Sequence, residues 1–269
     1  MTPSWADRVV GELRSVGLVE LLATAGLQDR VDRKYLLEQA TAARLVDALH
    51  PDHRVLELGA GGRATRVQGY STVYLDSTDL ACHRAHLQGR RQRWKARTRQ
   101  YVGSDLTRLE LKTKGLRGRT VKVSQELTPG AHGAADDAAH AFLDAGLRAA
   151  YGRGLDLALV PVLEVTYRRT TLASDDGATR LTLDTDLEVR TVDGRLVGGL
   201  RPDAVLVETK AGGRPGTADA VLRRLGVHEA SCSKYCLGTA MAAPWLPAAP
   251  FRPLLRRWFT AADEQALAA

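Results

Sequence analysis

Acidic and basic side chains recur two residues apart in segments whose other positions are apolar. The pairs with this spacing are Asp32–Lys34, Arg97–Arg99, Glu110–Lys112 and Glu208–Lys210. Only seven of the 38 basic residues are lysines, and nearly all of the seven stand in or beside these segments. Side chains two apart on a β-strand share a face. Each segment therefore predicts an apolar face and a face of long charged groups, and such faces bind a polyanion where they converge.

The competing interpretation is an ordinary sheet that shows its charged face to water. Each acid–base pair taken alone is then a cross-strand ion pair, which contributes little at a surface. Three features favour convergence: few Ser, Thr or Gln on the charged faces, the repeated acid–base spacing, and helices that cover the apolar faces. We therefore expect an α+β fold in which about eight largely antiparallel strands close into a barrel. The barrel forms a charged tunnel, with the helices packed outside.

The elements that must position these residues follow from hydrophobic periodicity. The pattern predicts helices over 4–27, 39–49, 134–151 and 217–226, the last capped by Thr217, with a further helix at PLLRRWF. Strands are predicted near 30–37, 54–58 and 71–76, and then in two runs, QRWKARTRQYV to GRTVKVSQEL and LALVPVLEVTYRRTTL to DAVLVETK. We expect one domain over 1–269, with a tunnel core at about 28–240, the N-terminal helix 4–27 and a tail at 241–269.

The bulk composition narrows the class of partner without selecting one. A net charge of +7 favours an acidic ligand or surface. Cys82, Cys232 and Cys236 are too few for a disulfide framework, which predicts a reducing, cytoplasmic location. The N-terminus lacks an apolar signal core, and no stretch approaches the roughly 18 apolar residues of a membrane span, so neither is predicted.

The strand motifs, taken in order, resemble the VTC domain, the catalytic domain of polyphosphate polymerases in the triphosphate tunnel metalloenzyme (CYTH-like) superfamily. The matching stretches are RVDRKYLL, STVYLDSTDL, GRRQRWKARTRQY, LELKTK, PVLEVTYRRT, TRLTLDTDL, VLVETK and SCSKYCLG. They run from about residue 30 to residue 238. Each is weak alone, but eight in the right order make a specific signal.

The resemblance implies roles for individual residues. The cations implied to act in phosphoryl transfer and to bind the phosphate chain are Lys34, Arg97, Arg99, Lys112, Arg169, Arg180 and Lys234, with Lys114 and Lys210 as further substrate-binding residues. Glu208 of the VETK strand is implied to hold a divalent metal, Mg²⁺ or Mn²⁺. Glu110 and Asp184 are implied to assist through water or to orient the cations, as Asp32 does.

One departure bears on the activity. The wider superfamily opens with Glu-x-Glu-x-Lys, whereas this strand has Arg30-x-Asp32-x-Lys34. The loss of one carboxylate weakens a hydrolytic mechanism and agrees with a polymerase. We therefore expect metal-dependent transfer of the terminal phosphate of ATP, or another nucleoside triphosphate, to inorganic polyphosphate. The alternatives are a metal-dependent triphosphatase or polyphosphatase and a non-catalytic module that binds polyanions or nucleic acid.

A basic run, HLQGRRQRWKARTR, stands apart from these assignments. It is interpreted either as a nucleic-acid contact or as a solvated loop that leads into a strand. A platform for single-stranded nucleic acid interleaves cations with aromatic rings. Only Trp94 and Tyr101 are near this run, so nucleic acid is not the expected partner.

Overall fold

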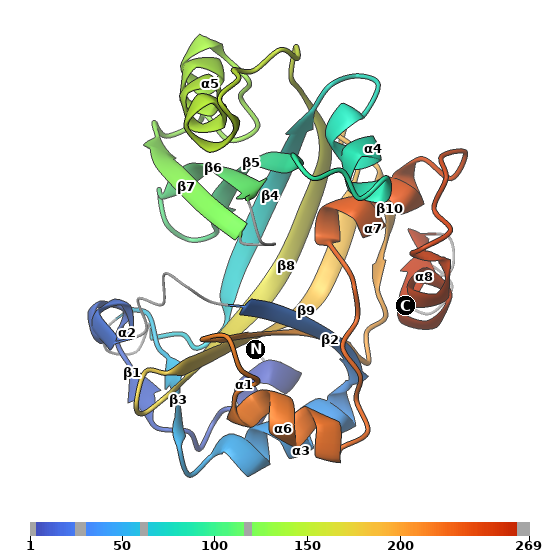
Figure 1. Cartoon of the computed structure of the whole chain (residues 1–269). Coiled ribbons are helices and arrows are strands. Elements are labelled where there is room, and N and C mark those ends of the chain that lie inside the picture. The colour runs from blue at the N-terminus through green and yellow to red at the C-terminus, as the bar shows by residue number, and fades with distance from the viewer. Residues whose placement is uncertain (1–3, 25–30, 60–63, 116–119, 263–269) are drawn as a thin grey trace. The chain divides into compact units, whose positions relative to one another are not determined.

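The computed structural model describes residues 4–24, 31–59, 64–115 and 120–262, which form a mixed α+β fold with many antiparallel strands (Figure 1). The helices are α1 (Trp5–Val9), α2 (Leu18–Thr24), α3 (Gln39–Leu49), α4 (Ala81–Leu87), α5 (Asp137–Tyr151), α6 (Thr217–Arg224), α7 (Lys234–Ala242) and α8 (Arg252–Trp258). The strands are β1 (Ser15–Val16), β2 (Val31–Glu38), β3 (His53–Leu56), β4 (Gln68–Asp76), β5 (Trp94–Tyr101), β6 (Thr107–Lys114), β7 (Thr120–Leu127), β8 (Val160–Ser174), β9 (Thr179–Arg190), β10 (Leu196–Leu200), β11 (Ala204–Ala211) and β12 (Phe259–Ala261).

The chain forms two compact units, each assembled from three segments. Unit 1 comprises Met1–Gln68, Tyr167–Asp186 and Leu200–Ser231. Unit 2 comprises Gly69–Thr166, Leu187–Gly199 and Cys232–Ala269. Strands β8 and β9 each contribute residues to both units.

The sheet of unit 1 has β11 at its centre, with antiparallel partners β2 and β9 on its two sides. Strand β3 pairs antiparallel with β8 and parallel with β1. Alternation gives this sheet one apolar face, which contains Tyr35, Val207 and Leu181, and one polar face. The strand pattern of the sequence therefore corresponds to a real division between the two faces.

Helices α3 and α6 cover the apolar face of unit 1 (Figure 1). Leu45 and Leu49 from α3 and Leu222 from α6 are buried against the strands. Their spacing places them on one side of each helix. Burying such side chains contributes roughly 1.5–3 kcal/mol each to folding, so the helices hold the sheet while leaving its polar face uncovered by this core.

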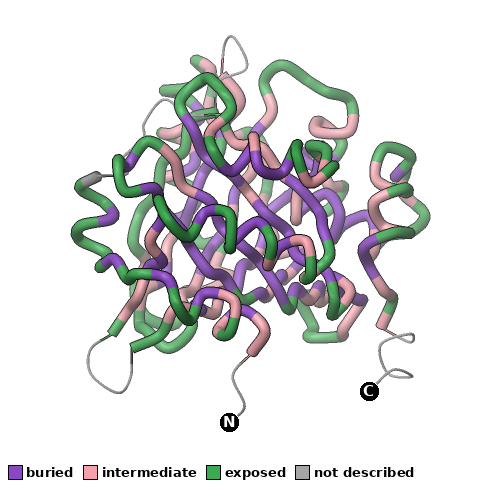
Figure 2. The backbone as a smooth tube through the Cα atoms, turned by 90° about the horizontal axis from the view of Figure 1, so that it is seen from below, coloured by how far each residue is buried: buried purple, intermediate pink, exposed green. Residues whose placement is uncertain are grey.

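Unit 2 contains the antiparallel order β4–β5–β6–β7. Its apolar face carries Leu75, Ala96, Leu109 and Leu111, and α5 packs against it through Leu143. Figure 2 maps the burial of each described residue along the backbone. The hairpin predicted between β5 and β6 and the helix predicted over 134–151 are thus confirmed.

The helix predicted over residues 4–27 is wrong. Helix α1 ends at Val9, and Ser15 and Val16 pair as a short strand with Val55 and Leu56 of β3 before α2 begins. The apolar residues at near-helical spacing instead enter two buried clusters, Val10 and Leu13 in one and Val16 and Leu21 in the other. Tertiary packing overrides the local helical pattern here. The end of the predicted helix, 25–27, lies outside the described residues.

A smaller correction concerns the start of α6 (Thr217–Arg224). The N-cap of α6 is Gly216 rather than Thr217, and the Asp219 carboxylate accepts a hydrogen bond from the Gly216 amide at 2.7 Å.

Among the described residues, the strand order runs from β12 to β7 without returning to its first strand, so the antiparallel sheet is shown but barrel closure is not. Within the described residues, no helix combines the length and apolarity that crossing a bilayer requires.

Candidate functional site

On the polar face of unit 1, strand register places acidic and basic side chains opposite each other on neighbouring strands. Glu208 of β11 lies directly opposite Lys34 of β2 and Thr182 of β9. One step along the same face, Lys210 lies opposite Asp32 and Arg180. Residues that face each other across an antiparallel pair have Cβ atoms about 4.5–5.5 Å apart. The register therefore brings the predicted residues of these three strands together on one face.

Asp184 completes this face on β9 and is fully buried. Arg169 of β8 donates to both of its carboxylate oxygens, at 2.6 Å and 2.7 Å. Burial opposes the charge of Arg169, but Asp184 outweighs it and keeps the pKa of the guanidinium well above its usual value. Arg168, the adjacent arginine, is exposed and lies 4.0 Å from Asp7. The alternation of β8 thus places Arg169, and not Arg168, on this face.

Lys210 is a cation of this face whose pKa is lowered by burial. Its ammonium lies 3.1 Å from the Glu208 carboxylate, and only 9% of its side chain is exposed. Burial lowers the pKa of Lys210 to about 8, although Glu208 acts in the opposite direction. A lysine with such a pKa is partly neutral just above physiological pH.

Unit 2 presents a second charged face, on the side of its sheet opposite α5. Its rows across β5, β6 and β7 are Lys95–Lys112–Lys122, Arg97–Glu110–Ser124 and Arg99–Arg108–Glu126. We call this set the cationic face of unit 2. Lys95, Arg108 and Lys122 belong to it although the sequence interpretation did not assign them. Their alternate positions beside Arg97, Glu110 and Lys112 are the signal that identifies them.

Glu110 is the buried centre of the cationic face, with 2% of its side chain exposed. Arg97 lies 2.7 Å from its carboxylate, Lys122 lies 2.6 Å away and Arg99 lies 3.4 Å away. Burial favours the neutral acid, but the charges of Arg97 and Lys122 outweigh it and lower the pKa of Glu110 to about 2. The carboxylate therefore stays ionised and fixes the positions of three cations.

Lys234 begins a helix, whereas the sequence interpretation placed it in a strand-like segment. It is the first residue of α7, whose N-cap Ser233 accepts a hydrogen bond from the Cys236 amide. The ammonium of Lys95 donates to the same Ser233 hydroxyl at 2.8 Å. The N-terminus of α7, with Lys234, therefore lies at the Lys95 end of the cationic face.

Two residues missed by sequence reasoning hold α7 in this place. Tyr235 donates a hydrogen bond to the buried carboxylate of Asp76, and its ring stacks on Tyr74 with centroids 4.8 Å apart. Asp76 also accepts from the amides of Cys82 and His83, which lie in the first turn of α4. Burial and the charge of Asp76 raise the pKa of Tyr235, so its hydroxyl keeps its proton as the donor.

A family model of the VTC domain matches residues 29–243, which is most of the chain. The chain belongs to the VTC domain family. A comparison with curated proteins finds no match.

The solved structures that are similar to this VTC domain are distant from it in sequence. A putative adenylate cyclase from Bacillus halodurans is 15% identical, with a TM-score of 0.45, over 77% of this chain and 94% of that one. A putative adenylyl cyclase from Hippeastrum, whose title reports a dominant triphosphatase activity, is 15% identical with a TM-score of 0.43, over 81% and 97%. The PH1819 protein from Pyrococcus horikoshii is 14% identical with a TM-score of 0.39, over 74% and 92%.

The donors available to a divalent metal in this VTC domain are few. Among the described residues, no three His, Cys, Asp or Glu side chains cluster as a metal cage. Mg²⁺ is usually held by one or two carboxylates together with substrate phosphates and water. Glu208 fits that pattern, since 14% of its side chain is exposed, and Thr182 opposite it has a buried hydroxyl without a hydrogen-bond partner in the described structure.

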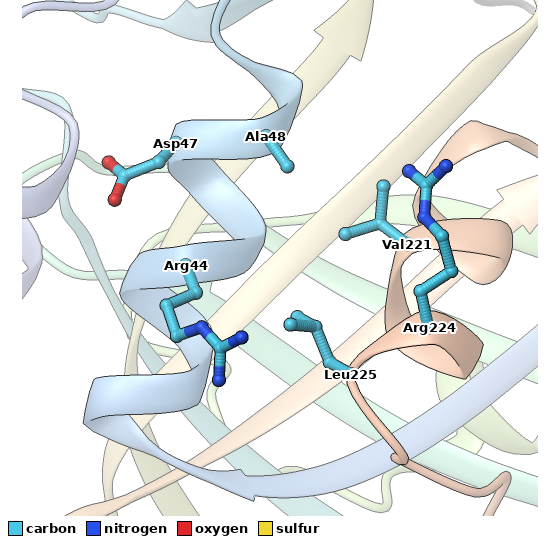
Figure 3. Close-up of a pocket in the computed structure, with 6 residues that line it drawn as sticks. All are labelled: Arg44, Asp47, Ala48, Val221, Arg224 and Leu225. Atoms are coloured by element: carbon cyan, nitrogen blue, oxygen red, sulfur yellow. The ribbon is translucent and has the colours of Figure 1, made fainter.

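One cavity lies away from the charged strand faces, and a second adjoins the end of the cationic face of unit 2. One, of about 470 Å³, lies between α3 and α6 of unit 1 and is lined by Arg44, Asp47, Ala48, Val221, Arg224 and Leu225 (Figure 3). It contains none of the predicted site residues, and its lining mixes both charges with apolar groups. The other, of about 720 Å³, is in unit 2 and includes one predicted residue, Lys114. Of the predicted site residues, all but Lys114 thus lie outside the linings of these two cavities.

The predicted residues fall into two groups in the structure. Unit 1 brings together Lys34, Arg169, Arg180, Asp184, Glu208 and Lys210. Unit 2 brings together Arg97, Arg99, Glu110, Lys112, Lys114 and Lys234. Each group contains one carboxylate that is saturated by cations, Asp184 in unit 1 and Glu110 in unit 2.

Proposed function

We propose that this VTC domain is a metal-dependent phosphotransferase that extends polyphosphate from ATP. The observation that carries the proposal is Glu208, a carboxylate that the register places among Lys34, Lys210 and Arg180. A module that only binds polyanions gains nothing from a carboxylate at the centre of its cations. Membership of the VTC domain family supports the same activity. We further propose one domain over 1–269, a closed barrel with a charged tunnel, and a cytoplasmic location.

The cations bind and align the phosphates. Arginine presents a planar fork to phosphate oxygens, and lysine a compact charge. In the reaction, an oxygen of the terminal phosphate of the chain attacks the γ-phosphorus of ATP. The bond from that phosphorus to the β–γ bridging oxygen breaks, ADP leaves, and the chain gains one phosphate. On unit 1, Lys34 and Arg180 offset the charge that spreads over the transferred group, and no covalent enzyme intermediate is required. On unit 2, Arg97 and Lys112 bind phosphates through the same charge complementarity.

Glu208 is the residue that we propose to hold Mg²⁺ or Mn²⁺, with Thr182 beside it. When bound, the metal neutralises phosphate charge. Asp184 and Glu110 have a different role in this proposal, because their carboxylates are already bonded to arginine. They position Arg169 and Arg97 so that the guanidinium groups need not reorganise when phosphates bind. Positioned charges of this kind stabilise a transition state more than mobile ones do.

Incubation of the purified chain with ATP and Mn²⁺ tests the proposal. Long-chain polyphosphate and orthophosphate are assayed separately, and a reaction without metal serves as the blank. Metal-dependent formation of polyphosphate, with ADP released in equal amount to the phosphate incorporated, is the expected result. Orthophosphate as the main product would replace the proposal with a triphosphatase or polyphosphatase. The absence of both products, with polyphosphate still bound, would leave a binding module.

A further inference from the structure

The cavity of about 720 Å³ in unit 2 is lined by an unusual concentration of positive charge. Its charged lining residues are Arg90, Arg91, Lys114 and Arg153, and no carboxylate lines it among the residues that the structure describes. We call these four residues the arginine pocket. Arg90 and Arg91 belong to the basic run that the phosphotransferase assignment does not use. Like charges gathered in a concave site raise the local concentration of anions.

The floor of the arginine pocket is held by Tyr151, the last residue of α5. Its hydroxyl accepts a hydrogen bond from the Lys114 amide at 2.9 Å and lies within donating distance of the carbonyls of Arg93, at 2.8 Å, and Lys114, at 3.0 Å. These bonds tie α5 to the ends of β5 and β6. One side of the pocket is therefore fixed by partly buried hydrogen bonds between the Tyr151 hydroxyl and the backbone, while the arginines of the pocket are exposed.

Two cations of the pocket, Arg90 and Arg153, are only weakly neutralised by the contacts that the structure describes. Arg90 donates to the neutral side chain of Gln88 at 2.7 Å. Arg153 lies 3.9 Å from Asp156, and both of these side chains are more than half exposed. Such an exposed ion pair contributes little and breaks readily when a stronger anion is present. The pocket thus favours a ligand that carries several negative charges.

Lys114 connects the pocket to the cationic face of unit 2. It stands two residues after Lys112 on β6, so the two belong to the same side of the strand. The distance along the strand is roughly 6–7 Å. Cations therefore continue from Arg97 and Lys112 to Lys114 and on to the arginine pocket, all within unit 2.

The lining also indicates which polyanion fits. Proteins that bind single-stranded nucleic acid stack the bases on several aromatic side chains. The arginine pocket offers one ring, Tyr151, beside four cations. Phosphates without bases need only the cations. We propose that the arginine pocket binds inorganic polyphosphate, so that a chain on the cationic face continues over Lys114 into the pocket. The identity of the ligand rests on the proposed function.

A charge-reversal pair tests this inference by binding alone. Arg91→Glu/Arg153→Glu alters two exposed pocket residues, and Arg195→Glu/Arg256→Glu makes the same change in net charge at exposed positions outside the pocket. Affinities for long-chain polyphosphate, triphosphate and single-stranded RNA are measured by titration at two salt concentrations. Thermal unfolding of each variant checks that the chain is folded, and Arg91→Gln/Arg153→Gln replaces the first pair if that variant is unfolded.

The pocket variant is expected to lose about tenfold in affinity for long-chain polyphosphate, because each lost charge-assisted contact weakens binding. Its affinity for triphosphate, which the cationic face of unit 2 would bind without the pocket, should change less than about twofold. The control variant Arg195→Glu/Arg256→Glu should also change less than about twofold in its affinities for long-chain polyphosphate and for triphosphate. Equal losses in the two variants would overturn the inference in favour of unspecific charge. A loss of triphosphate sites would indicate an independent small-anion pocket, and a loss confined to RNA would indicate a nucleic-acid contact. Because the readout is binding, the result stands even if the wild type makes no polyphosphate.

Discussion

Arg169 and Asp184 form a two-point contact on neighbouring strands, with Nε to Oδ1 at 2.6 Å and Nη2 to Oδ2 at 2.7 Å. Both side chains are almost entirely buried, at 11% and 0% exposure. Glu208, on the same strand face, contacts Lys210 at 3.1 Å and has 14% of its side chain exposed. The two carboxylates of this face therefore differ in burial, with Asp184 fully enclosed and Glu208 partly accessible.

The Arg169–Asp184 contact leads to a prediction about stability. Asp184→Asn leaves a buried guanidinium without its counter-charge, which typically costs about 3–5 kcal/mol. Asp203→Asn is the matched control, because Arg201 contacts Asp203 at 2.7 Å in an exposed pair of unit 1. That change should cost no more than about 1 kcal/mol. Urea unfolding measures both, and equal losses would show that Asp184 does not carry a buried charge contact.

The metal role of Glu208 predicts a specific loss of activity. Glu208→Gln keeps the shape of the side chain but removes the charge that a divalent cation needs. Turnover of ATP should fall by about 100-fold or more, as when electrostatic stabilisation of a transition state is lost, while the melting temperature changes little. Glu12→Gln, at an exposed carboxylate of unit 1, is the control. Wild-type turnover and an unchanged Mn²⁺ dependence in Glu208→Gln would remove the metal role.

Glu110 predicts a pH-dependent contribution to stability. Its pKa in the folded chain is about 2, below the ordinary 4.5. The folded state therefore favours the ionised form, and the contribution is present above pH 4.5 and lost as the pH falls through 2. A shift of this size corresponds to roughly 3 kcal/mol. Glu110→Gln should unfold at lower urea than wild type at pH 7, and the gap should narrow steadily from pH 4.5 to pH 2. A gap that is constant over this range would contradict the prediction.

Lys210 predicts a loss of anion affinity in mildly alkaline solution. With a pKa of about 8, the ammonium of Lys210 loses its proton as the pH rises through 8, and unit 1 loses one positive charge. Triphosphate should bind wild type more tightly than Lys210→Met at pH 7, by about tenfold. The two affinity curves should converge above pH 9. The affinities of both proteins are measured in one series of buffers, so that the pH-dependent protonation of triphosphate affects both equally. Affinity curves that stay parallel across this pH range would show that deprotonation of Lys210 does not cause the loss of affinity.

The charged faces could be predicted from the sequence because β-alternation is a local property. Glu208 and Lys210 share a face whatever strand pairs with theirs. Their neighbours could not be predicted in this way, because the register with Lys34 and Thr182 depends on pairing between distant segments. Family resemblance supplied the order of the strands, and the structure supplied their partners.

The errors have equally local causes. The segment around Lys234 was grouped with the strands, but Ser233 is an N-cap residue and the following α7 is buried on nearly all sides. A helix buried all round has little polar periodicity to identify it. In the N-terminal region, apolar spacing suggested one helix, yet Val16 is used in a strand pair with β3. A pairing between segments that are distant in sequence leaves no local signature.

The partner of β2 is made late in synthesis. Strand β2 ends at Glu38, and β11, which lies beside it in the sheet, begins at Ala204. A nascent chain therefore exposes the edge of β2 while most of the protein is translated, and such edges promote aggregation. Lys34 meets Glu208 only when this last central strand arrives. The pairing of Lys34 with Glu208 is thus a property of the finished polypeptide, and products of premature termination before β11 lack it altogether.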